Sequence, residues 1–169
     1  PFIFSPFLLS VLTVMWLLFF MNAFNFMDGL NGLAGGTTII ACIFLMGIGF
    51  YQNAAFIYVC ALILGFATLG FFIFNFPRAQ IFLGDTGSQF IALILASLGI
   101  IGTGHDHGTL SAFTVPLLFY VFIFDVILTI IRRAHKRRNI FSAHRSHVYQ
   151  LLNRAGLSHV AVSCIQFLH

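Results

Sequence analysis

Polar side chains at three-residue steps interrupt the first long apolar run of the chain. Asn22, Asn25, Asp28 and Asn31 follow one another at this spacing, and on a helix they would form a slowly drifting polar stripe. Three carboxamides and one carboxylate can bind sugar hydroxyls, a nucleobase edge or a hydrated metal ion. The alternative is a capped helix end in which Gly29 and its neighbours allow close packing. Polar groups near hydrocarbon are costly and usually functional, which favours the first interpretation.

A second polar motif, Gly84-Asp85-Thr86-Gly87-Ser88, holds another of the four aspartates in a chain that has no glutamate. Its glycines permit unusual backbone angles and the close approach of a phosphate, although Thr86 or Ser88 could equally cap a following helix. Magnesium usually takes one or two protein carboxylates and fills its other positions with water and phosphate. Asp85 at a membrane surface therefore favours Mg²⁺ shared with a substrate phosphate.

The third motif, His144-Arg145-Ser146-His147, lies in a basic segment. Two histidines beside Arg145 offer hydrogen-bond donors to phosphate or uracil oxygens. A zinc site is the competing interpretation, but neither a cysteine nor a carboxylate stands nearby in the sequence as a third ligand. We therefore expect this motif to contact a substrate rather than a metal.

The composition places all three motifs in an integral membrane protein. Hydrophobic residues make up 60% of the chain and charged residues 7%, and the mean hydropathy is +1.01, far outside the range of soluble domains. We expect an all-α, polytopic transmembrane helix bundle, a single catalytic domain over 1–169 with no nucleic-acid partner. Runs long enough to cross the hydrocarbon core, which takes about 20 helical residues, occur at about 7–24, 32–51, 55–76, 89–104 and 109–131, and a truncated sixth begins near Leu157.

Basic residues set the expected orientation, because positive charge near span ends marks the cytoplasmic side. Most of the Lys and Arg residues lie between the fifth and sixth runs, at Arg132, Arg133, Lys136, Arg137, Arg138, Arg145 and Arg154. Counting back places cytoplasmic loops at about 25–31, 76–88 and 132–157, so the three motifs converge on one membrane face, where their groups can cooperate. The cluster at 132–138, taken alone, could also be a topology signal or a patch for anionic lipid.

In this order and with these intervening spans, the motifs resemble those of the polyprenyl-phosphate N-acetylhexosamine-1-phosphate transferases. The resemblance runs from Asn22 to about Asn153 and includes Phe74-Asn75-x-Pro77-x-Ala79-x-Ile81-Phe82 ahead of the second motif. The family includes bacterial enzymes that begin O-antigen and related envelope polysaccharides on undecaprenyl phosphate, and the peptidoglycan enzyme that transfers phospho-N-acetylmuramoyl-pentapeptide. The resemblance implies a multi-pass enzyme of the bacterial inner membrane with its active site on the cytoplasmic face.

The implied reaction is Mg²⁺-dependent transfer of sugar 1-phosphate from a UDP-N-acetylhexosamine to a membrane-embedded polyprenyl phosphate, with release of UMP. By this resemblance Asp85 would bind the metal, for which Mn²⁺ could substitute, and Asp28 would be the second catalytic carboxylate. A homodimer is compatible with the resemblance. The expected substrate contacts come from all three motifs and the loop before the second, at Asn22, Asn25, Asn31, Arg78, His144, Arg145 and His147.

Two features favour the UDP-N-acetylhexosamine branch over the peptidoglycan branch, which is the alternative: the His-Arg-Ser-His form of the third motif, and Asn31. The family also carries adjacent acidic residues in an earlier cytoplasmic loop, and this chain has no Asp-Asp pair. We therefore expect that pair to precede Pro1 and this chain alone to be inactive as a transferase.

Other classes fit the motifs less well. A non-catalytic membrane relative is one alternative, because the acidic pair is missing. A transporter would more often need interrupted helices at the bilayer midplane than motifs gathered at one face. Asp125, at the inner end of the fifth run, could either pair with the Arg132 and Arg133 region or join the site.

Overall fold

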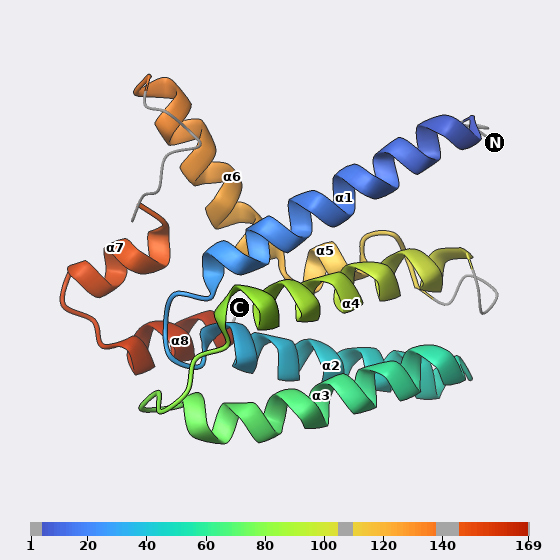
Figure 1. Cartoon of the computed structure of the whole chain (residues 1–169), viewed down its shortest axis with the longest axis horizontal. Helices are drawn as coiled ribbons and strands as arrows, with labels where there is room; N and C mark the ends of the chain where they lie inside the picture. The colour runs from blue at the N-terminus through green and yellow to red at the C-terminus, as the bar shows by residue number, and fades with distance from the viewer. Residues whose placement is uncertain (1–4, 105–109, 138–145, 169) are drawn as a thin grey trace.

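The computed structural model describes residues 5–104, 110–137 and 146–168, and these segments contain helices joined by turns, with no strand among them (Figure 1). The expected all-α fold is confirmed. The helices in chain order are α1 (Pro6–Met27), α2 (Leu33–Tyr51), α3 (Ala55–Asn75), α4 (Gly84–Gly104), α5 (Thr114–Leu118), α6 (Tyr120–His135), α7 (Val148–Arg154) and α8 (His159–Phe167).

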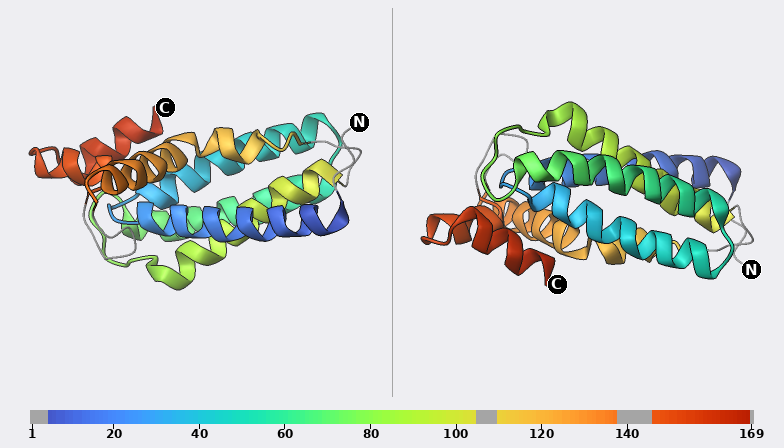
Figure 2. Two further views of the ribbon diagram at one scale, coloured as in Figure 1. Left: turned by 90° about the horizontal axis from the view of Figure 1, so that it is seen from above. Right: turned by 90° about the horizontal axis from the view of Figure 1, so that it is seen from below.

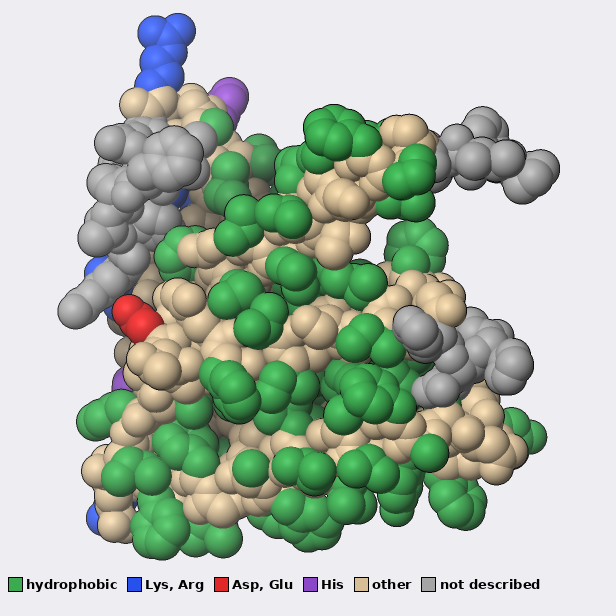
Figure 3. Space-filling model, turned by 45° about the vertical axis from the view of Figure 1, so that its right-hand side comes forward, with side chains coloured by type: hydrophobic (Ala, Val, Ile, Leu, Met, Phe, Trp, Pro, Cys, Tyr) green, Lys and Arg blue, Asp and Glu red, His purple; other side chains and the backbone are tan. Residues whose placement is uncertain are grey.

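Four of the helices, α1 to α4, are long and apolar enough to cross a membrane, as the first four hydrophobic runs predict. They lie roughly alongside one another, with α2 and α3 forming an antiparallel hairpin and α1 packed along α4 (Figures 1 and 2). Hydrophobic side chains cover much of the outer surface, while charged side chains gather toward one end of the bundle (Figure 3). This distribution suits helices that are surrounded by lipid.

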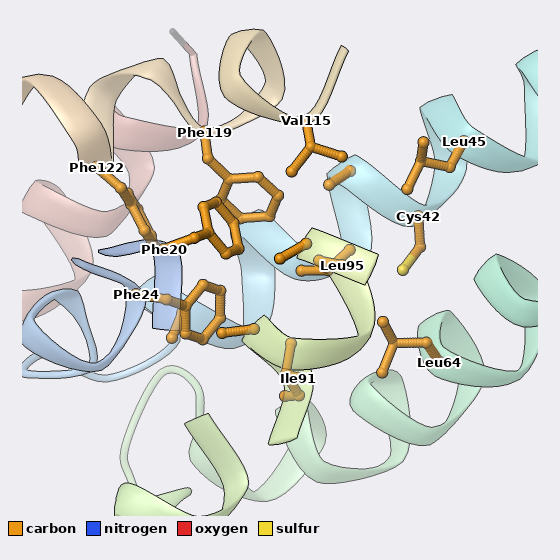
Figure 4. Close-up of a cluster of buried hydrophobic side chains, with 14 of the residues drawn as sticks. Phe20, Phe24, Cys42, Leu45, Leu64, Ile91, Leu95, Val115, Phe119 and Phe122 are labelled. Atoms are coloured by element: carbon orange, nitrogen blue, oxygen red, sulfur yellow. The ribbon is translucent and has the colours of Figure 1, made fainter. Parts of the chain in front are cut away.

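Aromatic rings fill the core where α1 meets α4, α5 and α6. Phe20 and Phe24 of α1 pack edge-on or tilted against Phe119 and Phe122, with ring centroids 5.3 to 5.8 Å apart. Leu95 of α4 lies in the same buried cluster (Figure 4). These contacts hold the end of α1, and hence its polar residues, against the rest of the bundle.

The fifth apolar run differs from the single span expected at 109–131, because it divides into α5 and α6 at Phe119. Phe119 has φ −117° and ψ 24°, outside the helical range, and its ring is buried. The change of direction therefore places that ring inside the aromatic cluster. The fourth helix also begins earlier than the sequence suggests, at Gly84 rather than near residue 89, so that Asp85 lies in its first turn.

Two loops at one end of the bundle are tied together by Asn75. Its buried side chain accepts a hydrogen bond from the Gly32 N–H at 2.7 Å and donates one to the Ile81 carbonyl at 2.9 Å. Gly32 has φ +76°, and a Cβ there would overlap the ring of Phe76, so glycine is required. Asn75 therefore fixes the loop after α1 relative to the loop that leads into α4.

Candidate active site

The first two motifs meet where α1 ends and α4 begins. The Asn25 amide donates one hydrogen bond to Asp85 Oδ1 at 3.1 Å and a second to Ser88 Oγ at 2.8 Å. Ser88 is buried and directs its own hydroxyl to the Asp85 carbonyl at 3.2 Å, so its oxygen must accept from Asn25. Residues about sixty positions apart in the sequence thus form one hydrogen-bonded cluster.

Asn25 can offer a ligand only its carbonyl oxygen, because both of its amide hydrogens are used within this cluster. The carboxylates of Asp28 and Asp85 are likewise acceptors when ionised. The cluster therefore presents only hydrogen-bond acceptors. Such oxygen atoms can coordinate a hard cation, whereas they repel a phosphate that has no cation bound to it.

Asp28 follows the last residue of α1 and is half-buried. Burial, and secondly the nearby charge of Asp85, raise the pKa of the Asp28 carboxyl to about 7. A cation bound by the two carboxylates would offset both the cost of burying the Asp28 charge and its repulsion by Asp85. Among the described residues no group of three or more His, Cys, Asp or Glu side chains forms a metal site, but Mg²⁺ shared with phosphate and water needs only one or two carboxylates. The residues present therefore fit Mg²⁺.

The start of α7 docks against the first motif through Tyr149. This side chain is buried, and its hydroxyl donates a 2.8 Å hydrogen bond to the carbonyl of Phe26. Gly29 lies directly beneath the phenol, because a Cβ at that position would overlap Tyr149 Oη. The helix that follows the third motif is therefore fastened to the loop that carries Asp28.

Of the third motif, the structure describes Ser146 and His147, whereas His144 and Arg145 lie outside the described residues. His147 is buried, with its ring centroid 5.8 Å from that of Phe26 and 5.9 Å from that of Tyr149. Its Nδ1 atom lies 3.3 Å from Asp125 Oδ1. The motif's second histidine is thus brought close to the end of α1, as the expected convergence requires.

The other expected substrate-binding residues lie farther from this cluster or are engaged elsewhere. Asn22 donates to the Leu18 carbonyl of its own helix at 2.7 Å. Asn31 donates to the Pro77 carbonyl at 3.3 Å, and its Oδ1 lies 3.3 Å from His159 Nδ1. Arg78 is exposed in the loop before α4. Asn31 therefore joins two loops to α8, a role that its spacing in the polar stripe did not suggest.

Sequence reasoning missed three residues that shape this region: Asn75, Tyr149 and His159. Asn75 belongs to the family pattern but was not assigned to the site. Tyr149 lies two residues after the end of the third motif. For both residues, the position beside a motif was a signal that the sequence offered. Nothing in the sequence marks His159, which reaches Asn31 from α8.

The apolar helices define a multi-pass membrane protein, and comparison with known proteins identifies its family. The family description "Glycosyl transferase family 4" matches residues 1–103, and the chain belongs to that family. A relative in Bacillus subtilis, a probable undecaprenyl-phosphate N-acetylglucosaminyl 1-phosphate transferase, is 36% identical over 149 residues, covering 88% of this chain and 41% of that protein.

Two further relatives are named for different substrates. The decaprenyl-phosphate N-acetylglucosaminephosphotransferase of Mycobacterium tuberculosis is 34% identical over 167 residues, covering 88% of this chain and 41% of that protein. A phospho-N-acetylmuramoyl-pentapeptide-transferase of Lactobacillus johnsonii is 35% identical over 143 residues, covering 85% of this chain and 44% of that protein. The chain thus spans about two fifths of the length of the curated relatives it matches.

Proposed function

We propose that the protein transfers N-acetylhexosamine 1-phosphate from a UDP-sugar to a polyprenyl phosphate, releasing UMP, at the cytoplasmic face of a bacterial inner membrane. The observation that carries the proposal is the hydrogen-bonded cluster of Asn25, Asp85 and Ser88 at one end of four apolar helices. Asp28 lies near enough for its charge to interact with that of Asp85. A polyprenyl acceptor keeps its phosphate at the membrane surface, which is the depth at which a cluster at the helix ends would lie.

The chemistry requires that one phosphate attack another. An oxygen of the lipid phosphate forms a bond to the phosphorus attached to the sugar, and the bond between that phosphorus and the bridging oxygen of UMP breaks, so that UMP leaves with the electron pair. Mg²⁺, when bound, neutralises charge on the phosphates and the leaving group. Asp28 and Asp85 would hold it, and the Asn25 carbonyl oxygen could contribute.

The protein's own residues then position the reactants. Asn75 joins the loop after Asp28 to the loop before Asp85. Tyr149 and His147 both contact Phe26, two residues before Asp28. The basic residues Arg78 and Arg145 are proposed to supply the hydrogen-bond donors that the acceptor-only cluster lacks. The same oxygen ligands support the proposed metal dependence, with Mn²⁺ as a substitute for Mg²⁺.

Among sugars, we favour N-acetylglucosamine 1-phosphate, as in the envelope-polysaccharide branch, because relatives from Bacillus and Mycobacterium carry that name. Asn31 and the form of the third motif support the same branch. The second candidate is phospho-N-acetylmuramoyl-pentapeptide, for which the Lactobacillus relative is named.

The test is UMP release by the purified full-length protein in detergent with undecaprenyl phosphate and Mg²⁺. UDP-N-acetylglucosamine and UDP-N-acetylmuramoyl-pentapeptide are supplied in parallel, and the lipid product is identified by mass. We expect turnover with the first donor and loss of turnover with EDTA. Turnover with the pentapeptide donor alone would assign the protein to the peptidoglycan branch, and turnover with neither, when the protein is folded, would refute the proposed function.

A further inference from the structure

Asp125 is one of the most deeply buried charged residues that the structure describes, with a relative exposure of 2%. It lies on α6, and the proposed reaction as set out above gives it no role. An isolated carboxylate buried in this way is strongly unfavourable unless its oxygens are satisfied by hydrogen-bond donors or an opposite charge. The identity of its partners therefore indicates what the residue does.

Three of its partners belong to the start of α7. The Asp125 carboxylate accepts a hydrogen bond from the Val148 N–H at 2.9 Å and one from the Tyr149 N–H at 3.3 Å, and its Oδ1 lies 3.3 Å from His147 Nδ1. The fourth partner, the Thr129 hydroxyl one turn along α6, donates at 3.1 Å.

The backbone contacts make Asp125 a cap for α7 supplied from another helix. The first N–H groups of a helix have no acceptor within that helix, and a carboxylate placed there also interacts favourably with the helix dipole. Within α7 itself, Gln150 Oε1 accepts from the His147 N–H at 3.2 Å. Nearby, Arg132 of α6 donates to the carbonyl of Ser146, two residues before α7 begins, so α6 also holds the chain that enters this helix.

The contact with the imidazole fixes the orientation of the His147 ring. Because a carboxylate can only accept, Nδ1 must carry the hydrogen that lies between them. Paired carboxylate and histidine side chains of this kind set both the tautomer and the direction of the ring in many sites.

The same turn of α7 is bound to the first motif. Tyr149, whose N–H is held by Asp125, donates its hydroxyl to the Phe26 carbonyl and packs on Gly29. Asp28 lies between these two positions in the sequence. A continuous set of contacts therefore runs from Asp125 through α7 to the loop that carries a proposed metal ligand.

We propose that Asp125 is a positioning residue for the transfer reaction: from α6 it caps α7, fixes the His147 ring and, through Tyr149, holds the described end of the third motif against the first. The inference rests on the proposed function, because the role of His147 depends on the substrate. It resolves the two options that the sequence left open in favour of the site.

The decisive variant is Asp125→Asn, which keeps an oxygen for the Val148 N–H but removes the charge facing His147. We expect kcat/KM for the UDP-sugar to fall on the order of 10- to 100-fold, the range found when a carboxylate that orients a histidine is lost. The melting temperature should also fall modestly, because the Tyr149 N–H loses its acceptor. Thr129→Val is the matched control, because it removes one neutral partner and leaves the carboxylate; it should stay within about threefold of wild type.

A double-mutant cycle with His147→Ala separates positioning from simple helix capping. If Asp125 acts through His147, Asp125→Asn should have little further effect, less than about threefold, in the His147→Ala protein. Binding of UDP-N-acetylglucosamine without lipid acceptor, measured by titration calorimetry, should weaken in parallel in both single variants. This second measurement does not depend on turnover.

The outcomes distinguish this inference from the proposed function. If wild-type protein neither binds nor turns over the UDP-sugar, the proposed function fails. If wild type is active and Asp125→Asn is equally active, or if the effects of the two substitutions multiply in the double variant, Asp125 is not a positioning residue for His147. Should Asp125→Ala fail to fold, the Asn variant and the cycle still decide the question.

Discussion

Substituting Asp28 by asparagine should stabilise the metal-free protein at alkaline pH while abolishing its activity. The pKa of Asp28 is raised from 3.8 to about 7, chiefly by burial and secondly by the charge of Asp85. A carboxyl with a raised pKa binds its proton more tightly in the folded state than in the unfolded one. Its contribution to stability is therefore fully present below about pH 4 and is lost as the pH rises through about 7.

The size of the effect follows from that difference of about three in pKa, which corresponds to about 4 kcal/mol as an upper bound. Asp28 is only half-buried, and solvent screens part of the interaction, so we expect about 1–3 kcal/mol. Asparagine has nearly the same shape and no charge. At pH 8 the variant should melt several degrees higher than wild type, and at pH 4 the two should be similar.

The assay is thermal unfolding of both proteins in detergent with EDTA at pH 4, 6 and 8, together with UMP release at pH 8 with Mg²⁺. Turnover of the variant should fall roughly 10²- to 10³-fold, as expected when a group that stabilises developing charge is lost. Added Mg²⁺ should raise the melting temperature of wild type more than that of the variant. A variant that is destabilised equally at every pH would show that the Asp28 charge is not unfavourable in the folded protein. A variant that keeps its activity within tenfold would show that the charge is not used in the reaction.

Two further predictions concern the same end of the bundle, and a third concerns its orientation in the membrane. Asp85→Asn should lower turnover by at least 10²-fold over a full Mg²⁺ titration; near-normal activity would remove it as the metal ligand. Gly29→Ala should destabilise the protein by about 1–3 kcal/mol by displacing the buried tyrosine of α7, whereas Gly70→Ala, where a Cβ meets nothing within 4 Å, should be neutral or stabilising in chemical unfolding. In a background without native cysteines, a cysteine at the exposed Gln80 should react with an impermeant maleimide only from the cytoplasmic side, and one at the exposed Gln52 only from outside; the reverse would invert the topology.

The four long helices could be predicted from the sequence because crossing hydrocarbon requires about 20 apolar residues, and polar residues, glycine or proline separate their runs. The break at Phe119 could not. The apolar run continues unchanged through that position, and hydropathy does not register a change of backbone direction that buries one ring among others.

The meeting of the first two motifs was predictable for a similar reason, since counting spans places both at the same membrane face. The contacts that hold the third motif were not. Tyr149 binds a backbone carbonyl, which leaves no pattern in the sequence of its partner. Asp125 reaches His147 across twenty-two positions, and its place in an apolar helix was equally consistent with pairing to a nearby arginine.

The hydrogen bonds of Asn25 bear on the order in which ligands must bind. Both amide hydrogens are bound to Asp85 and Ser88. The cluster therefore presents only oxygen atoms to a substrate, and these include the carboxylate oxygens of Asp28 and Asp85. A UDP-sugar without a cation would meet like charges there, whereas its Mg²⁺ complex would meet a matching donor set. Raising the pH deprotonates Asp28 and increases that contrast, because its pKa is about 7. If the proposed reaction is correct, the nucleotide sugar would therefore enter together with its metal, and the basic residues of the neighbouring loops would donate to its phosphate oxygens.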